Sequence, residues 1–314
     1  MFQNPEKNMK TRIIIIIIMV FMLILSLLYG CGKRTGSSET IVFTDGMQRQ
    51  VKVPKSVKRI ISMAPSVTEM LFAIGLNDEI IGVTDYCDYP EMAKEKPKIG
   101  GYYNPNIEVI LSLKPDIIIA TPDGYSKERI AKLEQAGIPI FLVNPRNLDD
   151  IFSSMIMLGN VTGKKEVAED VVKKLQSRVK VITDKVKHIK VKPKVFYELD
   201  HSPLITVGPN NFVDDLITKA GGINIANDAP SSWPQYSIEA VIMNNPDIII
   251  TAPYSMGSGN SSQPLINEWK KYRTISAVIN NKIYALNPDI VLRPGPRAVD
   301  GLESLYNIFH SNSR

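Results

Sequence analysis

Two loops of this chain carry aromatic side chains between turn-forming residues, where a packed core would not ordinarily place them. Residues 100–105 read Gly-Gly-Tyr-Tyr-Asn-Pro, with Tyr102 and Tyr103 at the centre, and residues 231–236 read Ser-Ser-Trp-Pro-Gln-Tyr around Trp233. Loops lie at the surface, so these flat faces are expected to meet solvent or a ligand. They suit a large, flat, partly apolar molecule. The alternative is ordinary packing of the loops against neighbouring parts of the protein.

Polar and aromatic residues also follow two predicted buried strands, the position at which open parallel sheets bind ligands. After a strand over 282–286, Asp289 could accept hydrogen bonds from ligand amides, and Arg293 could pair with a ligand acid. The same two side chains could instead form a structural ion pair, and the sequence leaves both interpretations open. Tyr86, which follows a strand over 80–83, has the same ambiguity.

Patterns for covalent or metal chemistry are weak. Asp200-His201-Ser202 contains the residue types of a catalytic triad, but neighbours in one loop cannot readily adopt relay geometry. Gly257-Ser258-Gly259 lacks the third glycine and the helix of a dinucleotide-binding fingerprint. The chain has three histidines, too few and too scattered for a multi-histidine metal site. We therefore expect a protein that is not an enzyme and has no metal or cofactor of its own, with an anchored hydrolase that uses His201 as a distant alternative.

The aromatic loops precede a segment that occurs twice. Residues 107–122 and 238–253 align at an offset of 131, and eight of the sixteen pairs are identical. Each copy follows a residue typical of helix N-caps, Asn106 or Ser237, and reads as a short helix, a proline stop and a buried strand. Tyr102 and Trp233, one aromatic from each loop, are also 131 residues apart. The duplication predicts two lobes of like architecture with a ligand cleft between them.

The second helical position of each copy is a glutamate, Glu108 in the first and Glu239 in the second. One interpretation is complementation of the helix macrodipole, worth about 0.3–1 kcal/mol. Their equivalence in both lobes favours another, in which two matched surface acids dock on basic sockets of a two-fold partner.

Strands that alternate with helices predict an α/β fold of two similar lobes, each with a parallel-rich sheet flanked by helices. The first lobe begins with an alternating pattern over 41–53 that predicts a hairpin. Ser66 and Glu69 have the spacing of a capping box at the start of a helix over 68–74.

One long amphipathic helix is predicted between the lobes, over residues 164–189. It has about 26 residues and a length of about 39 Å. No glycine or proline interrupts it, so we expect a stiff connection between the lobes. Its apolar face would consist of Val167, Val171, Leu175, Val179, Ile182, Val186 and Ile189.

The positive charge of the chain is concentrated near this helix. The chain has 37 basic and 32 acidic residues, a net charge of +5, and residues 164–194 hold eleven of the bases against four acids. A solvated helix face explains such a run, with attraction to anionic lipid as the alternative. No basic patch with interleaved aromatics occurs elsewhere, which argues against nucleic acid as the partner.

The N-terminus is typical of a bacterial lipoprotein signal. Three basic residues precede a sixteen-residue apolar run over 13–28 that is short for a spanning helix, and Gly30 stands directly before Cys31. Cleavage there, with lipidation of Cys31, would anchor the protein outside the cytoplasm. An uncleaved anchor is the alternative and leaves the body equally extracytoplasmic. The expected organisation is a signal peptide over 1–30, a tether over 31–40, an N-terminal lobe over 41–162, a connecting helix over 163–192 and a C-terminal lobe over 193–314.

Together these segments resemble the iron-siderophore and vitamin B12 class of ABC-transporter substrate-binding proteins. The resemblance runs from about Arg59 to the end. It rests on 64–69 (Ala-Pro-Ser-Val-Thr-Glu), Asp88-Tyr89-Pro90, both glutamate-to-proline-aspartate copies, Trp233-Pro234-Gln235, the long helix and the 293–297 loop. It implies two lobes that move little about one rigid helix, and delivery of a ligand to a permease and its ATPase. It also implies permease-docking roles for Glu108 and Glu239.

Within that family the chain looks closest to the cobalamin binders. Trp233, Tyr86 and Asp289 fall where cobalamin-contacting residues are expected. The chain departs from them at Tyr102, a position also open to tryptophan. It departs at Arg293 as well if that residue faces the cleft, because a cleft arginine suits an anionic ferric siderophore or a haem propionate better. We expect a cobalamin-like corrinoid as ligand, with a ferric siderophore or haem as the alternative, bound by Tyr86, Tyr102, Tyr103, Trp233, Asp289 and Arg293.

Overall fold

The fold is seen in a computed structural model that describes residues 39–124, 127–252 and 263–311. Contacts divide the chain into two units, residues 1–39 and residues 40–314, and the second contains every helix and strand named below. No helix among the described residues is both long and apolar enough to span a lipid bilayer. The predicted signal peptide, Cys31 and most of the tether lie outside the described residues, as do Pro253 and the Gly257-Ser258-Gly259 segment.

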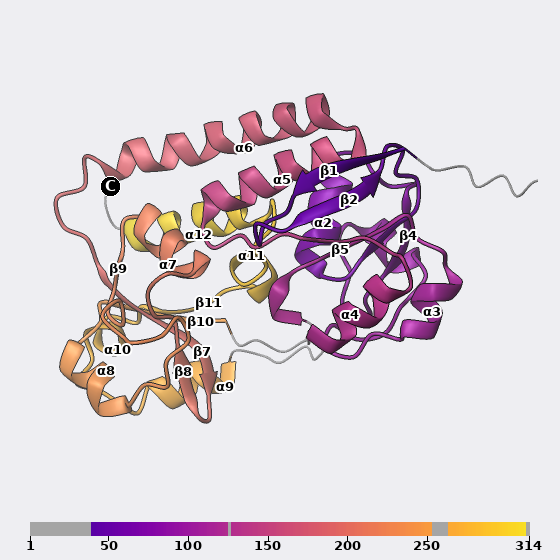
Figure 1. The fold of residues 1–314 in the computed structure, drawn as a ribbon. Coiled ribbons are helices and arrows are strands. Elements are labelled where there is room, and N and C mark those ends of the chain that lie inside the picture. Colours follow the sequence, from indigo (N-terminus) through magenta and orange to yellow (C-terminus); the bar gives the residue numbers. More distant parts are fainter. Residues whose placement is uncertain (1–38, 125–126, 253–262, 312–314) are drawn as a thin grey trace, which may run out of the picture. The chain divides into compact units, whose positions relative to one another are not determined.

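A sheet of four parallel strands forms the centre of the first half, in the order β4-β3-β5-β6. Figure 1 labels β4 and β5 of this sheet. Nearly all of its residues are apolar and buried, as expected where helices cover both faces of a parallel sheet. The predicted hairpin is also present and precedes the sheet. The strands are β1 (Thr40–Thr44), β2 (Gln50–Pro54), β3 (Ile60–Ser62), β4 (Ile80–Val83), β5 (Ile117–Ala120) and β6 (Ile140–Leu142).

The second half repeats this plan around a five-stranded sheet in the order β11-β10-β7-β8, with β9 also paired to β7. All pairs are parallel except the pair of β8 with β7. The central strand of each sheet therefore neighbours the strand of the repeated segment, and the prediction of two similar parallel-rich lobes is confirmed. The strands are β7 (Lys194–His201), β8 (Leu204–Thr206), β9 (Ile223–Asn224), β10 (Ile248–Thr251) and β11 (Ile283–Ala285).

Helices cover each sheet on two sides. One face of both sheets shares a continuous buried core with α2 (Pro65–Ala73), α5 (Leu148–Thr162), α6 (Lys165–Val186), α7 (Phe212–Lys219) and α12 (Ala298–His310). The other face of each sheet has a separate core. The first lies under α3 (Ile107–Ser112) and α4 (Lys127–Gln135), and the second under α8 (Ile238–Asn244), α9 (Gln263–Trp269) and α10 (Ser276–Ile279). The shorter elements are η1 (Glu91–Glu95), η2 (Pro122–Gly124) and α11 (Pro288–Val291).

The predicted connecting helix is α6, uninterrupted but only 22 residues long. It packs against α5, α7 and α12. Its buried face begins one residue later than predicted, because Ala168 and Val172 are buried while Val167 is 44% exposed. Gly159 of α5 explains the difference. A methyl group there would lie 2.6 Å from the Ala168 Cβ, so the two helices cross at a glycine and turn Ala168 inward.

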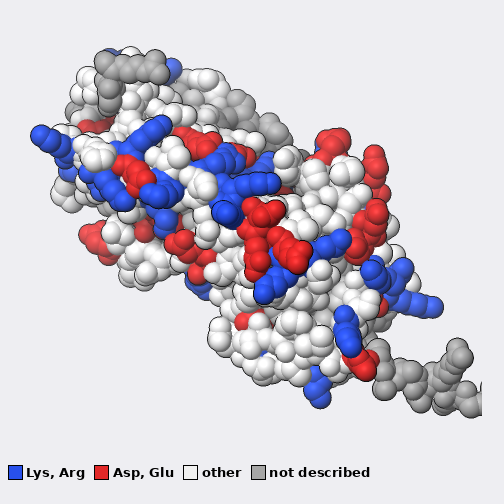
Figure 2. Space-filling model, turned by 90° about the horizontal axis from the view of Figure 1, so that it is seen from above, with Lys and Arg blue, Asp and Glu red and all other residues white. Residues whose placement is uncertain are grey.

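The basic residues of α6 are interspersed with acids rather than gathered in one patch. Figure 2 shows blue and red side chains side by side on the face seen from above. Asp184 accepts from Lys187 at 2.8 Å, and these two residues are three apart on the helix. Arg178 pairs with Glu303 of α12 at 2.8 Å. Such pairs are what a solvated helix face would contain.

The two copies of the repeat fold alike at their helix caps. The Asn106 side chain accepts from the backbone N–H of Val109, and the Ser237 side chain accepts from that of Ala240. This confirms the predicted caps and fixes the starts of α3 and α8.

The proline–aspartate pairs of the repeat, Pro115-Asp116 and Pro246-Asp247, have a structural role. The Asp116 carboxylate accepts from the backbone N–H of Arg59 at 2.9 Å, and the Asp247 carboxylate accepts from that of Lys194 at 2.8 Å. Each aspartate thereby accepts a hydrogen bond from the backbone N–H at the start of the neighbouring parallel strand, a donor that would otherwise lack a partner in the sheet. This requirement of the sheet accounts for the same pair in both halves.

Candidate functional site

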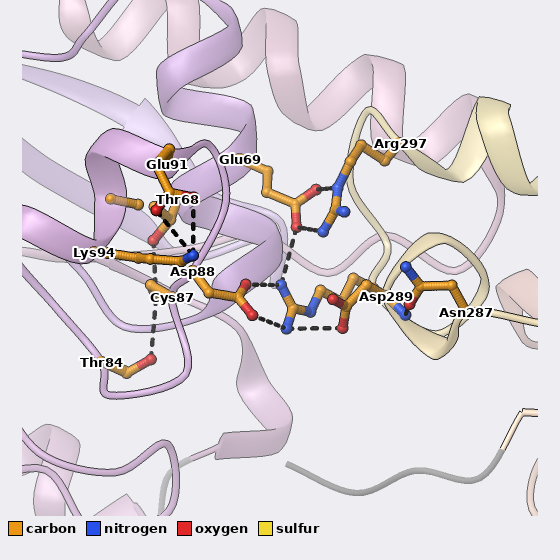
Figure 3. A network of polar contacts seen from close by, with 12 residues as sticks. Thr68, Glu69, Thr84, Cys87, Asp88, Glu91, Lys94, Asn287, Asp289 and Arg297 are labelled. Atoms are coloured by element: carbon orange, nitrogen blue, oxygen red, sulfur yellow. Dashed lines mark hydrogen bonds and ion pairs between the residues drawn. The ribbon is translucent and has the colours of Figure 1, made fainter. Parts of the chain in front are cut away.

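Glu69 links α2 to the C-terminal segment, a role that sequence analysis missed. α2 begins at Pro65, its N-cap Ala64 makes no side-chain bond, and Glu69 therefore lies inside the helix. The predicted capping box with Ser66 is wrong, because a proline in the first turn already starts the helix. The Glu69 carboxylate instead accepts from Arg297 at 3.0 and 2.6 Å (Figure 3).

Arg293 joins the same network and touches three carboxylates. It lies 2.6 Å from Asp88, 2.8 Å from Asp289 and 3.4 Å from Glu69. The structural ion pair left open by the sequence is therefore present. The short helix α11 creates it by placing Asp289 one turn before Arg293. The sequence carried a signal for this helix in Asn287-Pro288, an N-cap residue followed by proline.

The network contains more acidic than basic groups. Three carboxylates, Glu69, Asp88 and Asp289, face two guanidiniums, Arg293 and Arg297. Burial raises the pKa of Glu69 against the opposing effect of both arginines. Burial also acts to raise the pKa of Asp88, but hydrogen bonds and the charge of Arg293 outweigh it and hold that pKa below its ordinary value. Neither guanidinium is left without a carboxylate partner.

An aromatic ring extends the network. The Arg297 guanidinium lies 4.1 Å from the ring centroid of Tyr89, in the loop after β4. This stacking is a cation–π contact and leaves the ring 46% exposed. Glu69, Asp88 and Tyr89 precede α3 in the chain, whereas their partners follow β11. The network therefore ties the first half of the protein to the last.

The tyrosines of the first aromatic loop differ in exposure. The Tyr102 hydroxyl lies 2.7 Å from the hydroxyl of Thr121, and burial raises the pKa of Tyr102 to about 12. Its ring packs so closely on Gly124 that a methyl group there would lie 2.8 Å away. Tyr103 stands edge-on to Tyr102 at 4.8 Å and is 59% exposed. The half-buried Tyr86 ring lies next to Gly101 of this loop.

The second aromatic loop is fixed to β8. The carbonyl of Pro234 accepts from the backbone N–H of Thr206 at 3.1 Å, and Gln235 forms a bridge with Ile205. Trp233 projects from this anchored backbone and is 44% exposed. Tyr103 and Trp233 thus offer exposed rings, while Tyr102 is mainly packed. The structure brings Asp289 and Arg293 into direct contact, and a shared ligand site for all six predicted residues stays a prediction.

His201 has a structural partner. Its Nδ1 lies 2.6 Å from Glu198, a fully buried carboxylate that also accepts from the indole of Trp269 at 2.9 Å. The Asp200 carboxylate accepts from the backbone N–H of His201 and not from the ring. Within the described ranges no serine or cysteine side chain hydrogen-bonds the His201 ring. Likewise, no group of three or more histidine, cysteine or acidic side chains there could hold a metal ion.

The two repeat glutamates and the second cysteine lie in contrasting surroundings. Glu108 and Glu239 are both exposed on the first turns of α3 and α8.

Cys87 is buried, with its sulfur 3.1 Å from the hydroxyls of Thr68 and Thr84, and burial raises the pKa of its thiol. A raised thiol pKa disfavours the reactive thiolate, so Cys87 acts as a small core residue.

Comparison with known proteins decides the class of this protein. A model of periplasmic binding proteins matches residues 60–290, about three quarters of the chain. The chain belongs to this periplasmic binding protein family. A vitamin B12-binding protein of Vibrio cholerae is 33% identical over 254 residues, which cover 80% of this chain and 89% of the relative. The ABC transporter substrate-binding lipoprotein YvrC of Bacillus subtilis is 30% identical over 295 residues, which cover 89% of this chain and 91% of the relative.

Solved structures agree with this membership. The crystal structure of the periplasmic vitamin B12 binding protein BtuF of Vibrio cholerae superposes with a TM-score of 0.71 at 32% identity, covering 82% of this chain and 98% of that one. A possible iron-binding, periplasmic solute-binding protein from Staphylococcus epidermidis gives a TM-score of 0.72 at 30% identity, covering 81% and 99%. The protein is thus a periplasmic binding protein and not an enzyme, and its relatives include binders of vitamin B12 and a possible iron-binding protein.

Proposed function

We propose that this protein binds a cobalamin-like corrinoid between its two lobes and delivers it to the permease of an ABC importer. The excess of carboxylates over guanidiniums in the network of Glu69, Asp88, Asp289, Arg293 and Arg297 carries the choice of ligand. An arginine with a free charge would favour an anionic chelate. Here each guanidinium already has a carboxylate partner, and the carboxylates outnumber them. An anionic ligand would have to displace one of these carboxylates, whereas a ligand rich in uncharged amides would not.

The exposed rings of the aromatic loops support a flat ligand. Tyr103 and Trp233 are 59% and 44% exposed, although aromatic rings of this size usually bury most of their surface. The backbone of the Trp233 loop is anchored to β8, and a bridge between Gly100 and Pro105 closes the loop that carries Tyr103, so little ordering is needed when a ligand binds. By name, the Vibrio cholerae relative binds vitamin B12, which agrees with this ligand class.

Calorimetry on the purified protein tests the ligand. We expect saturable one-to-one binding of cyanocobalamin, and weaker or no binding of haem and of a panel of ferric siderophores. Replacing Trp233 by alanine should weaken corrinoid binding about tenfold, because a lost aromatic contact is worth roughly 1–1.5 kcal/mol. Val181→Ala is the matched control, since Val181 is 55% exposed but lies on α6. Absence of corrinoid binding by the wild-type protein would exclude the proposal.

A ferric siderophore or haem is the second candidate. Its support is the Staphylococcus epidermidis structure, which is that of a possible iron-binding protein. The same calorimetric panel decides between the two ligand classes.

Docking and anchoring complete the proposed role. Glu108 and Glu239 would contact the permease, one from each lobe, and lipid on Cys31 would hold the protein at the membrane outside the cytoplasm. Reversing both charges with E108K/E239K should abolish uptake while ligand affinity is retained. Cys31→Ser should release the protein from the membrane fraction. Normal uptake in the double variant would refute the docking role, and membrane retention of Cys31→Ser would refute the anchor.

A further inference from the structure

An exposed aliphatic residue lies one helical turn after each docking glutamate. Leu111 follows Glu108 by three residues and is 40% exposed, and Ile242 follows Glu239 by three residues and is 38% exposed. Residues three apart in a helix share a face. Leu111 and Ile242 also align at the repeat offset, so each lobe presents the same acid and the same kind of apolar side chain.

The inner side of each helix is already fully used. Ile110 of α3 is completely buried in the separate core beneath α3 and α4, and Val241 of α8 is completely buried in the separate core beneath α8, α9 and α10. These residues are also repeat equivalents. Their burial fixes the rotation of both helices, so the glutamate and the aliphatic residue must point outward. Among the described side chains, neither Glu108 nor Glu239 has a hydrogen-bond or ion-pair partner.

One exposed leucine or isoleucine is ordinary on a protein surface. Two at matched positions, each beside an acid that has no partner among the described side chains, require an explanation that applies to both lobes. A pair of equivalent patches matches a partner that presents two equivalent sockets. The acids also set the chemistry of those sockets, since an exposed carboxylate is complementary to a basic group.

We propose that Glu108 with Leu111, and Glu239 with Ile242, form two equivalent docking marks for a two-fold permease. Each permease socket would combine a basic group with an apolar pocket. This inference rests on the proposed transport function and extends it from charge to apolar contact. The glutamates would govern the rate of encounter and its salt dependence, while the aliphatic residues would govern how long the complex lasts.

The two marks are not identical in their apolar area. Met243 follows Ile242 and is 83% exposed, whereas the equivalent position in the first lobe is Ser112, whose hydroxyl bonds back to the carbonyl of Val109 at 2.8 Å. The unbranched thioether of methionine adapts to irregular pockets. The mark on α8 therefore offers more apolar surface, and its loss should weaken docking more than the loss of the mark on α3.

The test uses the full chain and proteoliposomes that contain the permease with which the wild-type protein supports uptake. In L111S/I242S we expect dissociation from these vesicles to be at least tenfold faster, with ligand affinity and thermal stability unchanged. In I242S/M243S the effect should exceed that of L111S alone. V167S/V181S is the matched control, because those valines are comparably exposed on α6 and should not affect docking.

Each outcome separates this inference from the proposed function. Wild-type dissociation in L111S/I242S, together with lost docking in E108K/E239K, would overturn the apolar marks and leave the docking glutamates standing. Normal docking of E108K/E239K would refute the docking role of the glutamates themselves. Circular dichroism of each variant checks that its fold is intact, so a change in docking is attributable to the surface.

Discussion

The Glu69→Gln variant isolates the carboxylate that ties α2 to the C-terminal segment. Glu69 is 2% exposed, and the side chains of its partners Arg293 and Arg297 are only 16% and 14% exposed. Removing one partner of a buried ion pair destabilises a protein by about 3–5 kcal/mol, because the remaining charge stays buried without a counter-charge. Arg293 retains two other carboxylates here, so we expect a loss of about 2–4 kcal/mol.

Thermal and urea unfolding measure this loss. For a chain of this size each kcal/mol lowers the melting temperature by about 2–4 °C, so the expected drop is roughly 5–15 °C. Glu91→Gln is the control, since Glu91 belongs to an ion pair with Lys94 in which both side chains are more than half exposed. It should leave the melting temperature unchanged. If Glu69→Gln melts at the same temperature as Glu91→Gln, the network does not contribute to stability.

Three further results are expected. Gly159→Ala should destabilise the protein by about 1–3 kcal/mol in urea unfolding, because its methyl group would meet Ala168; a neutral effect would show that α5 and α6 can move apart freely. Gly124→Ala should displace the Tyr102 ring and weaken ligand binding in calorimetry without a large loss of stability, and unchanged affinity would remove Tyr102 from the site. The lowered pKa of Asp88 means that its ionised form stabilises the fold above the ordinary value of 3.8 and that this contribution disappears as pH falls further. The stability difference between wild-type and Asp88→Asn should therefore be fully present at pH 6 and shrink as pH falls below 3.8, and a difference that does not change with pH would contradict the sign.

Local patterns were sufficient for the elements of the fold. Alternation over 41–53, N-caps at Asn106 and Ser237, and proline-led apolar runs each describe contacts within a few residues of one another, and all appear where predicted. The duplicated segment added the likeness of the two halves, because a repeated sequence must bury the same face in the same way. Asn287-Pro288 also carries the local signal of a helix start, which the sequence analysis did not use.

The capping-box error has a different cause. The spacing of Ser66 and Glu69 fits a local bond, but the carboxylate gains more by pairing with two arginines that lie more than 220 residues away in the chain. A pattern confined to four residues contains no information about such partners.

By itself, the sequence determined the alternation of strands and helices, the two matched lobes and the outward glutamates, since each follows from periodicity and caps within one segment. Only the tertiary structure decided what the charged and aromatic side chains do. It gave Arg293 three carboxylate partners, packed Tyr102 on Gly124 while exposing Tyr103 and Trp233, and set Leu111 and Ile242 beside the glutamates at the surface. The physical reason is that burial and charge pairing depend on distances between segments remote in the chain, whereas helix and strand formation depends on near neighbours.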